Sequence, residues 1–126
     1  MTPRPANANT PVVTALDPET VGQLIASLGA IDLVPILHTF GEDLGRLAKE
    51  HEAAVAAGDA EGARRAAHAL AGTGAGIGAK RLESAARLAM VPGTQDRAFQ
   101  AAAIRAETDA ALIEIATLAR DLAAKG

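Results

Sequence analysis

Residues 104–122, IRAETDAALIEIATLARDL, carry the pattern that decides the fold class. No glycine or proline interrupts the stretch, and its apolar side chains gather on one side of a helix. The inward positions alternate in steps of four and three residues, the spacing of a helix that packs in a bundle. They are Ile104, Thr108, Ala111, Ile115, Leu118 and Leu122. We predict a long amphipathic helix here.

Four further helices are predicted upstream from start and stop signals. A short helix begins at the cap formed by Asp17 and Pro18 and ends at Gly29. A long helix follows Asp32, a third covers residues 60–76 and a fourth covers residues 79–90. Residues 58–59 and 91–93 are predicted turns, and Thr94 is the predicted cap of the last helix.

The composition favours the same class. About a quarter of the residues are alanine, the best helix former, and the β-branched and aromatic runs that build strands are nearly absent. Short connections between amphipathic helices favour antiparallel neighbours. We therefore predict an all-α domain, an up-and-down antiparallel four-helix bundle with a short additional N-terminal helix, over residues 14–126. Residues 1–13 are predicted to be a disordered lead-in.

Composition also excludes several classes of function. The chain has no cysteine, so we expect neither disulfides nor thiol chemistry, and a reducing, cytoplasmic location. The net charge of −3 and 2% aromatic residues do not provide a basic, stacking surface for nucleic acid. No uncharged stretch reaches the roughly 20 apolar residues of a membrane span, and no targeting signal precedes residue 12.

His68 has the most unusual surroundings of the three histidines, in residues 64–78, RRAAHALAGTGAGIG. At about 100° per residue, Ala66, Leu70, Thr73 and Ile77 lie nearly opposite His68 and form the predicted buried stripe. His68 should therefore face solvent. The predicted exposed face around it holds Glu61, Arg64, Arg65, Ala71, Gly72 and Ala75.

Gly72 and Arg64 indicate what this face is for. Glycine inside a helix costs about 1 kcal/mol relative to alanine, so Gly72 indicates that a partner requires free space beside His68. An exposed neutral imidazole is a competent nucleophile toward an acyl phosphate. Arg64, one turn earlier on the same face, is the best candidate to hold the phosphoryl oxygens, with Arg65 on the other flank.

The remaining motifs predict no second site. His38 is expected to pack partly buried and His51 to lie on the surface, and neither is spaced for a metal site, so no metal is predicted. Gly74, Gly76 and Ala79 fit a dinucleotide fingerprint, but helical sequence precedes them where a strand is required. A nucleotide site is therefore not expected.

The segment from Asp59 to Ala89 resembles the histidine-containing phosphotransfer (HPt) domains of two-component phosphorelays. His68-Ala69-Leu70-Ala71-Gly72, followed by Gly78 and Leu82, matches that family's spacing. A looser resemblance extends over all but the first dozen residues. The family usually has lysine three residues after the histidine, where this chain has Ala71. Arg64, Arg65 or Lys80 is the expected substitute.

The resemblance implies that His68 is the phosphorylated residue and that Gly72 clears space for a receiver domain. The chain would be a phosphocarrier rather than an enzyme, relaying phosphoryl groups between a histidine kinase, receiver domains and response regulators. It would need no cofactor, because the receiver supplies magnesium. One alternative is the dimerisation segment of a sensor kinase, but Ala69 stands where that family usually has an acidic residue after the histidine. The other alternative is a helical adaptor without phosphoryl chemistry, which the alanine at position 71 favours.

Overall fold

A computed structural model describes residues 14–93 and 96–125. Within those ranges the chain forms five helices and no strand, which confirms the all-α prediction. The predicted lead-in, residues 1–13, lies outside the described residues. The helices are α2 (Pro18–Leu28), α3 (Ala30–Ala56), α4 (Ala60–Ile77), α5 (Lys80–Ala89) and α6 (Arg97–Lys125).

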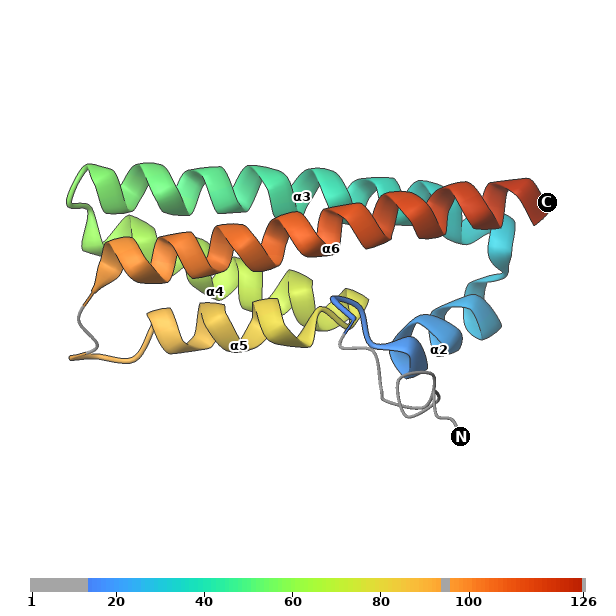
Figure 1. Ribbon diagram of the computed structural model, residues 1–126, viewed down its shortest axis with the longest axis horizontal. Coiled ribbons are helices and arrows are strands. Elements are labelled where there is room, and N and C mark those ends of the chain that lie inside the picture. Colours follow the sequence, from blue (N-terminus) through green and yellow to red (C-terminus); the bar gives the residue numbers. More distant parts are fainter. Residues whose placement is uncertain (1–13, 94–95, 126) are drawn as a thin grey trace, which may run out of the picture.

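The helices α3, α4, α5 and α6 run lengthwise, and each reverses the direction of the one before it (Figure 1). Each of them packs against two others: α3 against α4 and α6, and α5 against the same two helices. The short helix α2 contacts α3 at one end of the molecule. None of the described helices combines the length and the apolar character that a membrane crossing requires.

Most helix boundaries follow the capping residues in the sequence. Asp17 accepts a hydrogen bond from the Thr20 amide, and Asp59 accepts one from the Gly62 amide, so both are side-chain N-caps. Gly29 ends α2 with a φ of 83°, a conformation that glycine adopts without strain. The helix α3 begins at Ala30 and includes Asp32 in its first turn, so it starts three residues earlier than expected.

The start of α6 differs from the prediction. Thr94, the expected cap, lies outside the described residues. Instead, the Asp96 carboxylate accepts a hydrogen bond from the Phe99 amide at 2.9 Å, and the Gln100 amide donates to the Asp96 carbonyl oxygen. Asp96 is therefore the residue that caps this helix.

The core contains leucine and isoleucine separated by many alanines. The predicted inward seam of α6 is confirmed, since Ile104, Thr108, Ala111, Ile115 and Leu122 are buried and only Leu118 is half-buried. The other helices contribute large side chains that are fully buried and contact this seam or one another: Leu33, Leu37, Leu44, Leu70, Ile77 and Leu82.

Two histidines lie where the sequence analysis did not place them. His38 is exposed, although we expected it to be partly buried, and His51 is only 2% exposed, although we expected it at the surface. The positions follow from helical spacing: His51 continues the buried series after Leu44 and Ala48 in steps of four and three residues. His38 is next to buried Leu37 and therefore points about 100° away from it.

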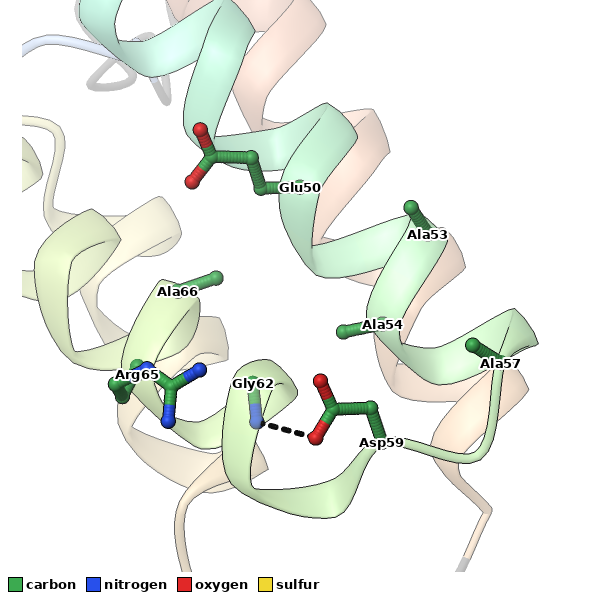
Figure 2. A pocket seen from close by; sticks show the side chains of 8 residues that line it. All are labelled: Glu50, Ala53, Ala54, Ala57, Asp59, Gly62, Arg65 and Ala66. Carbon is green, nitrogen blue, oxygen red and sulfur yellow. Dashed lines mark hydrogen bonds between the residues drawn. The ribbon is translucent and has the colours of Figure 1, made fainter.

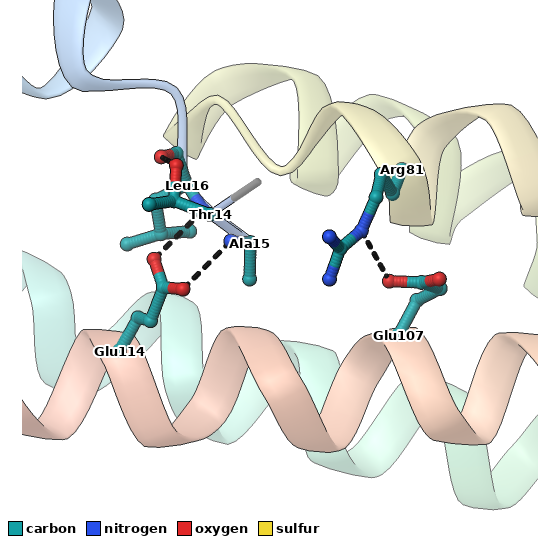
Figure 3. A network of polar contacts seen from close by, with 6 residues as sticks. All are labelled: Thr14, Ala15, Leu16, Arg81, Glu107 and Glu114. Atoms are coloured by element: carbon teal, nitrogen blue, oxygen red, sulfur yellow. Dashed lines mark hydrogen bonds and ion pairs between the residues drawn. The ribbon is translucent and has the colours of Figure 1, made fainter. Parts of the chain in front are cut away.

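A polar network fixes the segment before α2 against the bundle (Figure 3). The Glu114 carboxylate accepts hydrogen bonds from the Ala15 amide at 2.7 Å and the Leu16 amide at 3.0 Å. The Asp17 amide donates to the Gly78 carbonyl oxygen at 2.7 Å. Residues 14–17 therefore connect α6 to the turn between α4 and α5.

Candidate functional site

His68 lies on the exposed face of α4, as predicted. Its neighbours on that face, Arg64, Gly72 and Ala75, are exposed as well. On the opposite face Ala66, Leu70 and Ile77 are buried, while Thr73 is half-buried. Within the described part of the chain, the His68 imidazole has neither a hydrogen bond nor an ion pair. It is therefore accessible to a reactant from outside.

Ala71 does not belong to the exposed face, which corrects the sequence analysis. Its side chain is only 2% exposed and lies in the hydrophobic core. Ala71 is about 60° around the helix from His68 and about 60° from Gly74, so it lies between the two. A Cβ on Gly74 would be 3.5 Å from the Ala79 carbonyl oxygen and 3.7 Å from the Glu83 amide, so α5 covers this flank. Position 71 is therefore closed to a partner.

The other glycines inside α4 differ from Gly72 because a side chain at their positions would contact neighbouring residues. A Cβ on Gly76 would approach the Phe40 ring to 3.3 Å, and one on Gly62 would overlap the Asp59 carboxylate. Gly74 packs closely against α5. A Cβ on Gly72 would meet nothing within 4 Å. The fold itself gives no reason for a glycine at this position.

Arg64 and Arg65 lie on different flanks of His68. Arg65 forms an ion pair with Glu61 at 3.8 Å and lines a small hollow toward α3. Figure 2 shows Arg65 on α4 with Glu50 on α3 across this open space. Arg64 lines a second hollow, toward residues 89–93 and the start of α6, and makes no ion pair with any described residue. Arg64 is thus the unpaired cation one turn from His68.

Lys80 is not brought next to His68. It is the first residue of α5, beyond the end of α4. Ile77 at that end lies nine positions after His68, about 14 Å along the helix at 1.5 Å per residue. The Lys80 ammonium instead lies 3.6 Å from the Asp17 carboxylate.

Arg87 is a cation on the neighbouring helix α5 that was not among the predicted site residues. Gly74 on α4 lies near Ala79 and Glu83 of α5, and Arg64 shares a hollow with Met90. Because α4 and α5 run antiparallel, residues of α5 that lie between these two contacts face residues of α4 between Gly74 and Arg64. Arg87 therefore lies at about the level of His68 along the helix pair. Its guanidinium binds Glu83 at 2.8 Å. Only the pairing of α4 with α5 reveals this shared level, although the Glu83–Arg87 spacing is visible in the sequence.

His51 is excluded as an accessible nucleophile because it is buried. Its Nδ1 atom has no hydrogen-bond partner among the described residues, and neither does the buried Thr108 hydroxyl. Burial lowers the pKa of His51, with the Glu52 carboxylate acting in the opposite direction and Arg97 reinforcing the decrease. His51 is therefore a neutral core residue. Among the described residues, no group of three or more acidic, histidine or cysteine side chains could hold a metal ion.

Comparison with known proteins finds no relative. No family model matches the chain, and it matches neither a curated protein nor a solved structure. A function must therefore be argued from the chain's own residues. The relevant observations are the accessible imidazole of His68, the open space at Gly72 and the guanidinium of Arg64, which has no ion pair with a described residue.

Proposed function

We propose that this chain is a histidine phosphotransfer protein that accepts a phosphoryl group on His68 and passes it on in a two-component phosphorelay. The proposal includes the architecture: α3, α4, α5 and α6 form the antiparallel up-and-down bundle of an HPt domain, with α2 as the additional N-terminal helix. It also includes a cytoplasmic location, where histidine kinases and response regulators exchange phosphoryl groups.

The observation that carries the proposal is the open space at Gly72 beside an accessible His68. A Cβ there would meet no atom within 4 Å, and glycine weakens a helix by about 1 kcal/mol relative to alanine. No contact between Gly72 and the described part of the chain compensates for that cost. A partner that must approach the imidazole closely gives a reason for the missing side chain.

The proposed chemistry is reversible transfer between an aspartyl phosphate and the imidazole. A ring nitrogen of neutral His68 attacks the phosphorus in line, an N–P bond forms, and the P–O bond to the aspartate breaks. The aspartate leaves as a carboxylate, and the other ring nitrogen keeps its proton. Magnesium bound to the receiver would neutralise phosphoryl charge, so this chain needs no cofactor.

Cations of this chain would assist in holding the transferred group. Arg64 is the first choice because it lies one turn from His68 and has no competing ion pair. Arg87 would have to leave Glu83 in order to contribute. Because Ala71 is buried, a lysine at that position would not lie freely on this surface. The arrangement therefore differs from the usual HPt pattern in how the phosphoryl oxygens are held.

The test is phosphorylation of the purified chain by receiver domains charged with acetyl phosphate, read by intact-mass analysis. We expect one added phosphoryl group, labile in acid and absent from His68→Gln. The matched control is His38→Gln, since His38 is the other exposed histidine among the described residues. Labelling that survives His68→Gln would contradict the assignment. Receiver binding without any phosphoryl transfer would favour the adaptor alternative.

A further inference from the structure

A hollow at the N-terminal end of α4 is not accounted for by the phosphoryl chemistry. It lies between that end of α4, residues 89–93 at the end of α5 and just after it, and the start of α6. Arg64 and Arg97 line it from two different helices, and Met90, Val91 and Pro92 add apolar surface. Val91 is 49% exposed, so the hollow presents apolar surface to solvent.

The charge of this hollow is positive. Neither Arg64 nor Arg97 forms an ion pair with a described residue, whereas Arg46, Arg65 and Arg105 each bind carboxylates. Glu61 also lines the hollow, but its carboxylate lies 3.8 Å from Arg65. Two unneutralised guanidinium groups beside apolar side chains are suited to a carboxylate flanked by apolar residues.

We propose that this hollow binds an acidic, partly apolar segment of the receiver-type partner that exchanges phosphoryl groups with His68. The inference rests on the proposed function and deepens it by naming a second contact for the partner. Arg64 connects the two places, because it lines the hollow and also lies one helical turn from His68. A partner seated here is therefore held beside the imidazole, and Arg97 contributes to its recognition without touching the phosphoryl group.

The experiment compares Arg97→Glu with Arg120→Glu, a charge reversal at an exposed site on the same helix, near its other end. The donors are receiver domains encoded in the same genome and charged with acetyl phosphate, and transfer to the full chain is measured as kcat/KM at two salt concentrations. Phosphoramidate, a small donor that needs no docking, labels His68 in parallel. An acidic residue at the start of α6 favours its helix dipole, so Arg97→Glu should remain folded.

We expect Arg97→Glu to reduce kcat/KM from receivers on the order of fivefold, with a weaker salt dependence, because rim charges act mainly on association. Phosphoramidate labelling should be unchanged, and Arg120→Glu should behave as wild type. Equal rates for Arg97→Glu and wild type, or equal losses for both variants, would overturn the docking proposal while leaving the phosphotransfer function intact. Failure of both donors to label His68 would refute the phosphotransfer function, and the docking proposal with it.

Discussion

Substitution of Gly72 by alanine tests whether the open space at this position serves the fold or a partner. The new Cβ would meet no atom within 4 Å, so no steric cost offsets the gain in helix propensity. That gain is about 1 kcal/mol, which corresponds to an increase of about 3–5 °C in Tm for a domain of this size. Thermal unfolding followed by circular dichroism measures it.

Neighbouring glycines supply matched controls for the same substitution. Gly76→Ala should gain less, because its Cβ would lie 3.3 Å from the Phe40 ring, which would have to shift. Gly78→Ala should lower Tm, because Gly78 has a φ of +78° and its Cβ would lie 2.8 Å from Thr20. A destabilised Gly72→Ala variant would refute the conclusion that the domain itself does not need this glycine.

The second half of this prediction concerns transfer. Gly72→Gln should preserve the fold but place a long side chain beside His68, displacing an incoming receiver. Displacements of about 1 Å can cost on the order of a hundredfold in rate, so we expect transfer to fall about tenfold or more. Labelling by phosphoramidate should be much less affected. Receiver-dependent transfer at the wild-type rate would show that no partner uses the space at Gly72.

The remaining predictions address the buried histidine, the N-terminal anchor and the cations. Burial lowers the pKa of His51 in the folded protein, so below pH 6.5, the ordinary pKa of histidine, the unfolded state binds more protons than the folded state. The unfolding free energy should therefore fall with decreasing pH, by up to about 1.4 kcal/mol per pH unit. The variant His51→Leu should remove this slope in urea titrations. Glu114→Ala should cost about 2 kcal/mol in the same assay by leaving the amides of residues 15 and 16 without an acceptor. Ala71→Lys should lower Tm, because it places a charge at a position that is 2% exposed. Arg64→Ala should shorten the lifetime of phospho-His68 about two- to fivefold, whereas Lys80→Ala should leave it unchanged.

Much of the helical layout was predictable because its signals are local. Asp17 and Asp59 cap helices through their own side chains, and Gly29 ends one through a conformation that other residues avoid. Periodicity likewise identified the buried seam of α6 and the exposed position of His68. These features depend on residues within one or two turns of each other.

The errors concern packing between helices. Ala71 is about 60° from His68, close enough to share its face on an isolated helix, but α5 covers that flank. His51 is buried because the face of α3 that packs on the core continues along seven turns of this helix. Position 51 lies on that face, so any residue there would be internal. Arg87 and Arg97 approach the site only through the antiparallel pairing of distant segments. The contacts of Ala71, Arg87 and Arg97 leave no periodic trace in the sequence, whereas the burial of His51 follows the spacing of Leu44 and Ala48 and could have been predicted from it.

The central claim is that His68 carries the phosphoryl group, and acid-labile phosphorylation of intact chain measures it most directly. Wild-type protein and His38→Gln, incubated with acetyl phosphate-charged receivers, should each gain one phosphoryl group. His68→Gln should gain none and keep the wild-type Tm, because its side chain is exposed and makes no polar contact with described residues. Phosphorylation of His68→Gln to the wild-type level, or the absence of any phosphorylation in wild type with every receiver tested, would contradict the account.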